Sequence, residues 1–229
     1  MKILLVFFTL FFTKTIYAGT SFQDGLKHYQ SKEYTQAYKV FLELAKNGYE
    51  EAQYNLGLLY MDGLGIEKDC HKAIHWFKKA SLKDDIDATY NIATLYDAGE
   101  CIEEDNEEAL FWYEKAISLG DEEAIYFAGV IYADKEDYKK SYDYFLKSSL
   151  LRNEFSMYEL AYQYFYGQGT KRDYFKSYLW VKLSILNGND TEFTNNNLDV
   201  VRDRLSFGKV MEANTKASNC FNDSLISCI

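Results

Sequence analysis

Two histidines and a cysteine form the strongest candidate for metal chemistry in this sequence. Cys70, His71 and His75 are close along the chain, and the two histidines are four residues apart, which places both imidazoles on one face of a helix. A tetrahedral zinc site needs a further ligand that this stretch lacks, and no glutamate follows His71 as it does in zinc proteases. We therefore predict solvent-exposed histidines, no metal site and no cofactor.

An acidic stretch from Glu100 to Glu108 is the next candidate, because clustered carboxylates can bind calcium. The stretch lacks the alternating oxygen ligands of a calcium loop. Carboxylates before and within the first turn of a helix are stabilised by its positive end, and the same explanation covers Asp69 and Asp173. We therefore expect helix N-termini at these places. The sequence offers no Ser/His/Asp set, phosphate-binding glycine loop or paired-carboxylate site, so we predict a protein that is not an enzyme.

A column of tyrosines has the best potential for binding a ligand. Its members occupy one position of a repeated segment, and a carboxylate precedes each of the first three by three residues. The tyrosines are Tyr54, Tyr90, Tyr126 and Tyr158, and the carboxylates are Glu51, Asp87 and Glu123. Tyrosine offers a wide contact area and a polar tip, so such a column suits an extended, partly basic peptide or a glycan strand. Half-buried tyrosines between repeats would give the same pattern, and the sequence leaves both interpretations open.

The tyrosines belong to segments of similar sequence that recur along the chain. The segments start at Ala52, Ala88, Ala124 and Ser156, which are 36, 36 and 32 residues apart. Each is followed by a second motif that joins a small residue to a bulky, mostly aromatic pair. The pairs are Trp76-Phe77, Trp112-Tyr113, Tyr144-Phe145 and Trp180-Val181. A degenerate copy at residues 34–41 brings the number of units to five.

Each unit predicts a first helix, a turn and a second helix. In the first helix one small residue interrupts a stripe of large apolar side chains and leaves a notch into which the second helix can press. These small residues are Gly57, Ala93, Gly129 and Ala161. Glycine turns join the two helices at residues 63–65 and 167–169. The third unit has Cys101 in place of its second glycine, and in the fourth unit residues 133–137 replace the turn.

Neither helix of a unit can bury its apolar stripe alone, so adjacent units must stack on one another. A plain helical bundle would not repeat aromatic and small positions in this order. The sequence therefore predicts an all-α protein, a right-handed α-solenoid of about five helix-turn-helix repeats with capping helices at its C-terminus.

These residues resemble the Sel-like repeat family, a relative of the tetratricopeptide repeat. Residues 52–80 match nearly all of the family's pattern of Ala-x-Tyr-Asn-Leu-Gly-x-x-Tyr, Gly-x-Gly, Asp, Lys-Ala and Trp-aromatic-x-Lys-Ala. Residues 198–206 and 210–213 are similar to the capping helices that close such arrays. The resemblance implies that the tyrosine column faces a concave groove, and that the protein is an adaptor in multiprotein complexes.

The four cysteines, Cys70, Cys101, Cys220 and Cys228, suggest disulfides if the protein is exported, and four cysteines allow three pairings. Cys70 precedes a second helix, and Cys101 follows the first helix of the next unit. Because successive helices alternate in direction, both residues belong to the same edge of the solenoid. We therefore predict a Cys70–Cys101 bond between two repeats and a Cys220–Cys228 bond that closes a small C-terminal loop.

The N-terminus has the features of a signal peptide. Lys2 gives a basic start, an apolar run spans residues 3–12, and Ala18 supplies a small residue at the cleavage site. The run is too short to cross a bilayer comfortably as a mature helix, so we predict residues 1–18 as the cleaved segment and a periplasmic or secreted protein with no mature membrane span. The remaining chain divides into a solenoid at 19–190 and capping helices with a disulfide-closed tail at 191–229.

The chain is acidic, and its charge excludes some partners. The net charge of −10 becomes −12 without Lys2 and Lys14, since 23 basic residues then face 35 acidic ones. Phosphate backbones and anionic lipids repel such a chain, so we expect no nucleic acid partner. We predict a non-catalytic interaction scaffold or adaptor of the bacterial envelope, or a secreted one, that binds another protein or an extended peptide on its concave face. The resemblance also implies contact with host cells in pathogens, and leaves peptidoglycan binding or modification as the alternative.

Overall fold

The computed structural model describes residues 21–228, and the predicted signal peptide lies outside this range. Within it the chain forms twelve α-helices and one short 3-10 helix, and no strand. The helices are α1 (Phe22–Gln30), α2 (Tyr34–Lys46), α3 (Glu50–Asp62), α4 (Cys70–Ser81), α5 (Ile86–Ala98), α6 (Asn106–Leu119), α7 (Glu123–Asp134), α8 (Tyr138–Leu150), α9 (Glu154–Tyr166), α10 (Tyr174–Leu186), α11 (Glu192–Arg202), α12 (Phe207–Asn222) and η1 (Leu225–Cys228). The predicted all-α class is confirmed.

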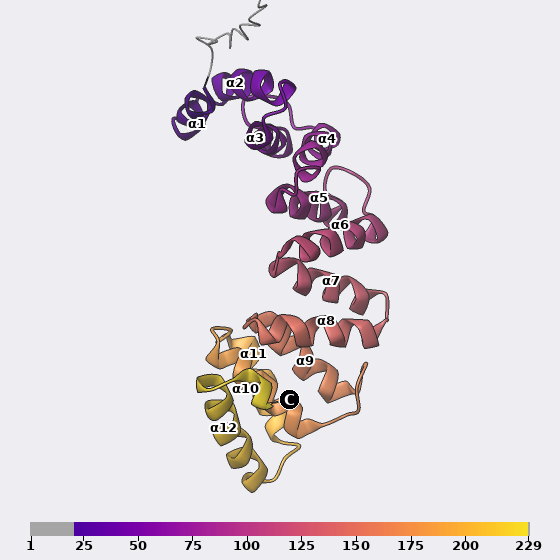
Figure 1. Ribbon diagram of the computed structural model, residues 1–229. Helices are drawn as coiled ribbons and strands as arrows, with labels where there is room; N and C mark the ends of the chain where they lie inside the picture. Colours follow the sequence, from indigo (N-terminus) through magenta and orange to yellow (C-terminus); the bar gives the residue numbers. More distant parts are fainter. Residues whose placement is uncertain (1–20, 229) are drawn as a thin grey trace, which may run out of the picture.

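The helices form antiparallel pairs that stack into a curved solenoid (Figure 1). The odd-numbered helices are the first helices of the pairs and the even-numbered ones the second helices. From α1 to α10 each helix packs on the helices before and after it in the chain, and α11 and α12 both pack on α10. Turns within pairs lie on one edge of the solenoid, and turns between pairs lie on the other. Among the described residues, no helix combines the length and apolarity that a membrane span requires.

Aspartates begin several second helices, as the sequence predicts. The carboxylate of Asp69 accepts a hydrogen bond from the backbone N–H of Lys72, at 3.0 Å, and so caps α4. Asp173 caps α10 in the same way. In the acidic stretch, Asp105 accepts from two backbone N–H groups of α6 at 3.0 Å each. These carboxylates satisfy donors that have no partner inside the helix, and they lie at the positive end of the helix dipole.

The small residues of the first helices form the notches that the repeat pattern indicates. A Cβ atom added at Gly57 would lie 2.5 Å from Cε1 of Phe77, so the ring of α4 rests directly on the backbone of α3. Gly129 meets Phe145 of α8 in the same way, at 2.8 Å. Both rings are almost completely buried. The two helices of a pair approach this closely because no side chain separates them.

Each turn within a pair contacts the start of the preceding second helix, and the contact differs from unit to unit. Gly65 lies against α2, where a Cβ atom would be 2.5 Å from the backbone nitrogen of Thr35, and its positive φ of 73° also favours glycine. Gly169 packs in the same way on the start of α8. Cys101 occupies the place of Gly65 one unit later, and its disulfide reaches the first residue of α4. In the fourth unit, Lys135 forms an ion pair with Glu107 of α6.

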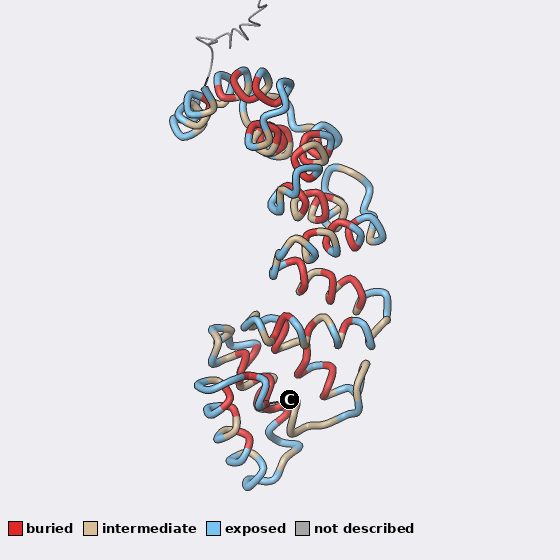
Figure 2. Tube along the Cα trace, in the orientation of Figure 1, coloured by how far each residue is buried: buried red, intermediate tan, exposed pale blue. Residues whose placement is uncertain are grey.

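The buried residues lie along the inside of the stack, where adjacent helices face one another (Figure 2). They form two apolar clusters, one from Ala37 to Tyr132 and one from Phe145 to Cys228. The boundary coincides with α8, whose buried face consists of one large residue, Phe145, and three serines. The two buried clusters therefore meet in the fourth unit, which lacks a glycine turn, and half-buried side chains such as Tyr126 of α7 and Tyr144 of α8 pack across the boundary.

Candidate partner-binding face

The tyrosine column lies along the first helices, at equivalent positions of α3, α5, α7 and α9. All four members are half-buried: Tyr54, Tyr90, Tyr126 and Tyr158. The first three pack on the second helix of their own unit, with ring centroids, in chain order, 5.8 Å from Phe77, 5.8 Å from Tyr113 and 6.0 Å from Phe145. One side of each of these rings therefore belongs to the packing of its own unit.

The hydroxyl ends of Tyr54 and Tyr90 meet the first helix of the next unit. The Tyr90 ring packs on Phe127 of α7, and burial, followed by the charge of Glu123, raises the pKa of Tyr90. Tyr54 lies near Asp87 of α5, and burial, followed by the charge of Asp87, raises the pKa of Tyr54. Asp87 and Glu123 thus face the tyrosine of the preceding unit rather than the one three residues later. The column joins neighbouring units as well as forming a surface.

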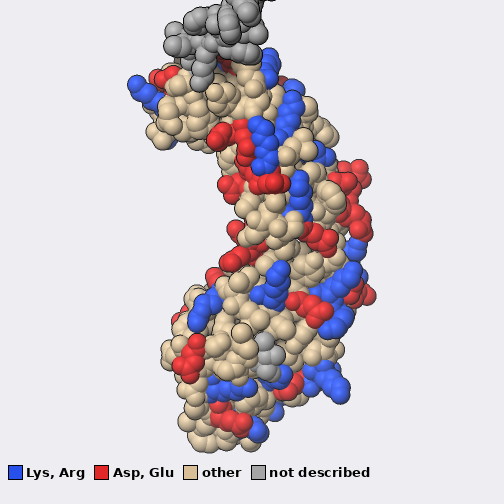
Figure 3. All heavy atoms as spheres, in the orientation of Figure 1, with Lys and Arg blue, Asp and Glu red and all other residues tan. Residues whose placement is uncertain are grey.

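The three predicted carboxylates form an acidic edge. Glu51, Asp87 and Glu123 are exposed in the first turns of α3, α5 and α7, where the positive end of each helix stabilises them. In Figure 3, acidic side chains gather on the hollowed side of the molecule over its middle units. A ligand that approached the tyrosine face of these units would therefore meet negative charge, which favours a partner with basic groups.

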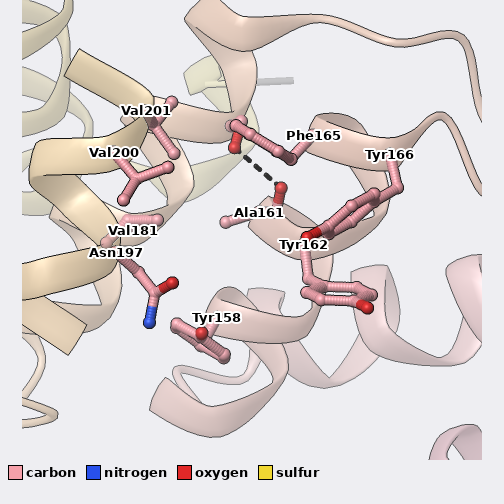
Figure 4. Close-up of a pocket in the computed structure, with 10 residues that line it drawn as sticks. Tyr158, Ala161, Tyr162, Phe165, Tyr166, Val181, Asn197, Val200 and Val201 are labelled. Carbon is pink, nitrogen blue, oxygen red and sulfur yellow. Dashed lines mark hydrogen bonds between the residues drawn. The ribbon is translucent and has the colours of Figure 1, made fainter. Parts of the chain in front are cut away.

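The column ends at a cavity between α9 and α11. Its volume is about 60 Å³. Compared with the volume of one water molecule, this is room for a few waters or one small apolar group. The lining residues come from α9, α10 and α11, and Figure 4 shows them facing a common space. They are Tyr158, Ala161, Tyr162, Phe165, Tyr166, Ser177, Val181, Asn197, Val200 and Val201. Tyr158 is thus the last member of the column and one wall of the cavity.

The mouth of this cavity exposes large apolar side chains. Tyr162 and Tyr166 are 45% and 50% exposed, their ring centroids are 4.4 Å apart, and Val200 on the opposite wall is 51% exposed. Sequence reasoning missed these residues. The pattern that could have revealed them is the spacing of Tyr158, Tyr162 and Tyr166, which are four residues apart and so lie on one face of a helix.

The candidate metal cluster does not form a pocket of ligands. His71 and His75 are both exposed on α4. Across the described part of the chain, no group of three or more His, Cys, Asp or Glu side chains is arranged to hold a metal ion. Cys70 bonds instead to Cys101, with Cα atoms 6.0 Å apart, and Cys220 bonds to Cys228, with Cα atoms 5.7 Å apart.

Comparison with known proteins identifies the repeat. The family model described as Sel1 repeat matches residues 50–85, 86–121, 123–153 and 155–189. The chain belongs to the Sel1 repeat family. The four Sel1 repeats correspond to the pairs from α3–α4 to α9–α10, so α1–α2 and α11–α12 lie outside the match. The cavity is therefore formed where the last Sel1 repeat meets a helix that is not part of the family pattern.

Solved structures with the same repeat share the fold. A Sel1 repeat protein from Oxalobacter formigenes is 24% identical, with a TM-score of 0.61, over 74% of this chain and 86% of that chain. The protective antigen c5321 of uropathogenic Escherichia coli, which displays an SLR fold, is 22% identical, with a TM-score of 0.51, over 91% of this chain and 55% of that chain. At these identities the likeness concerns the fold.

Two curated relatives match shorter segments. The ERAD-associated E3 ubiquitin-protein ligase component HRD3A of Arabidopsis thaliana is 34% identical over 71 residues, which are 31% of this chain and 10% of that protein. DAP3-binding cell death enhancer 1 of Mus musculus is 40% identical over 50 residues, 22% of this chain and 10% of that protein. This chain thus matches only a small part of each relative. Sel1 repeat proteins are protein interaction scaffolds.

Proposed function

We propose that this protein is a non-catalytic scaffold that binds a partner protein along the tyrosine face of its first helices. The observation that supports this most directly is the open end of the column, where Tyr162, Tyr166 and Val200 expose apolar surface around a cavity. Soluble proteins seldom leave aromatic side chains grouped around a cavity without a binding role. The acidic edge over the middle units complements this surface and favours a partner segment that carries basic residues.

We also propose that the scaffold acts outside the cytoplasm, in the bacterial envelope or beyond it. The basic start, the apolar run and the small residue at Ala18 support export. Two disulfides among four cysteines suit an oxidising compartment. Contact with a host cell is one role that such a location permits.

Co-purification from an envelope extract tests the proposal. The disulfide-intact protein is immobilised, and an equal amount is assayed in parallel for binding to peptidoglycan sacculi. We expect a protein partner to be retained in stoichiometric amount, and the Tyr162→Ala and Tyr166→Ala double variant to retain less of it. Saturable binding to sacculi with no retained protein would contradict the scaffold and favour the peptidoglycan alternative. Fractionation of the producing cells tests export, and recovery of the chain with free thiols in the cytoplasm would contradict it.

A further inference from the structure

We propose that the cavity between α9 and α11 holds an apolar side chain of the partner, and that Glu159 pairs with a lysine or arginine close to that side chain. The inference rests on the proposed scaffold function and names the chemistry of the segment that is bound. The segment is extended, with one aliphatic or aromatic anchor and one basic residue beside it.

The cavity suits an anchor of this kind because its walls are apolar and its mouth is open. Val181, Val200 and Val201 form one side, and the aromatic rings of α9 form the other. A cavity volume of about 60 Å³ accommodates the end of a leucine, isoleucine or phenylalanine rather than a whole drug-sized ligand. The exposed rings of Tyr162 and Tyr166 would then cover the anchor and exclude water around it.

Glu159 lies on α9 next to Tyr158 and three residues before Tyr162, both of which line the cavity. It is half-buried on α9, and its side chain forms no ion pair or hydrogen bond with any of the residues that the structure describes. Burial raises the pKa of Glu159, and the neighbouring carboxylate of Asp134 at the end of α7 raises it further. An ionised carboxylate that is half-buried and close to a second carboxylate is unfavourable when no cation is near. A basic group of a partner would offset both the cost of burial and the repulsion.

Glu159 and the cavity are close enough to be occupied by one short segment. Glu159 and Tyr162 are three residues apart on α9, so their side chains are neighbours on the helix surface. The charge of Glu159 also contributes to the raised pKa values of Tyr158 and Tyr162, which line the cavity. An extended chain rises about 3.3 Å per residue, so the basic residue should be one to three positions from the anchor.

The charge of the chain argues for a different protein as the occupant. This chain has a net charge of −10, so a second copy would bring further acidic groups to Glu159 and Asp134. A basic segment has the opposite preference, and its binding would weaken as the salt concentration rises.

Selection from a random peptide library displayed on phage tests the inference while the natural partner is still unidentified. The disulfide-intact protein is the bait, and the enriched peptides are then synthesised and titrated by fluorescence anisotropy. We expect a consensus with an aliphatic or aromatic residue one to three positions from Lys or Arg. Glu159→Lys should weaken binding of these peptides ~10-fold, because one attraction becomes a repulsion. In a new selection the same variant should favour Asp or Glu at the former basic position.

Matched variants separate the cavity from general effects. Tyr162→Ala and Val200→Asp change exposed side chains at the mouth, and each should weaken the selected peptides at least ~5-fold through loss of apolar contact. Phe111→Ala and Glu67→Lys change an exposed aromatic and an exposed carboxylate elsewhere, and should leave the affinity within ~2-fold, since neither touches the cavity or the acidic edge. Circular dichroism establishes that each variant is folded.

The outcomes distinguish this inference from the proposed function. No consensus, or peptides that bind equally well to Glu159→Lys and Tyr162→Ala, would overturn the inference. If an envelope protein is still retained by these two variants as by the wild type, the scaffold function stands and its binding site is elsewhere. Selected peptides that lack a basic residue but lose affinity with Tyr162→Ala would overturn the part assigned to Glu159.

Discussion

The substitution Gly57→Ala tests the notch that brings α3 and α4 together. Alanine is normally the better helix residue, by about 1 kcal/mol, so propensity alone predicts a more stable protein. Here the new methyl group would lie 2.5 Å and 2.6 Å from two carbons of the Phe77 ring, which is 0% exposed. Overpacking of this kind costs about 1–3 kcal/mol, and such short contacts with a buried ring place it at the upper end.

The net effect is therefore a destabilisation of about 2 kcal/mol, because an overpacking cost of about 3 kcal/mol is partly offset by a gain in helix propensity of about 1 kcal/mol. For a chain of this length, each kcal/mol lowers the melting temperature by about 2–4 °C, so Gly57→Ala should melt about 4–8 °C lower. The assay is thermal unfolding followed by circular dichroism. Gly208→Ala is the control, since a Cβ atom there meets nothing within 4 Å, and it should melt at the same temperature or slightly higher.

A second substitution tests the cause directly. Phe77→Leu alone removes buried surface and lowers stability, but in the Gly57→Ala background it also removes the atoms that clash. The double variant should therefore be more stable than the sum of the two single effects predicts, by about 0.5–3 kcal/mol of coupling. A Gly57→Ala protein as stable as the wild type, or additive effects in the double variant, would refute the close packing of these two helices.

Three further predictions concern other contacts between units. Reducing the Cys70–Cys101 bond, or replacing both residues by serine, should lower the free energy of unfolding by roughly 3–4 kcal/mol on the chain-entropy model for a separation of 31 residues. A mass spectrum of a non-reducing digest that links Cys70 to a C-terminal cysteine would contradict the pairing. Tyr90→Ala should lower the melting temperature because it removes the ring contacts with Tyr113 and Phe127, whereas Tyr90→Phe keeps these contacts and should melt close to the wild type. An unchanged melting temperature for Tyr90→Ala would show that the column does not contribute to packing. Burial raises the pKa of Tyr60 and of Tyr142 to about 12, and the unfolded chain loses these protons first, so the stability that the two groups contribute should be complete below pH 10 and decline from pH 10 to 12. Melting temperatures and tyrosinate absorbance measured across that range test this prediction, and constant stability would contradict it.

The repeat pattern predicted the fold because it reflects contacts within and between neighbouring units. Gly57 and Phe77 lie on two helices that one short connection joins, and a small residue and a bulky residue recur at these two positions in the later repeats. Their packing could therefore be inferred from the sequence spacing. The aspartate caps could be predicted for a similar reason, since a cap involves residues two or three positions apart. Local rules therefore determine most of a solenoid.

The site was harder to predict because its cavity forms where the last Sel1 repeat meets α11, a helix outside the repeat. The tyrosine column follows the repeat, and the structure shows that its first three rings pack on the second helix of their own unit and that Tyr90 also packs on Phe127 of the next unit. The exposed rings of Tyr162 and Tyr166 face a cavity only because α11 replaces a further Sel1 repeat at that position. No spacing within the repeat indicates how far α11 lies from α9, so the cavity could not be derived from the pattern.

The position of α8 between two parts of the array has a mechanical consequence. In a stack of units that contact only their neighbours, a bending load passes through every interface in series. α8 lies between the segment that contains the Cys70–Cys101 bond and the segment that contains the cavity. A change in the packing of α8 therefore changes the angle between the acidic edge and the cavity, although neither of these contains a residue of α8.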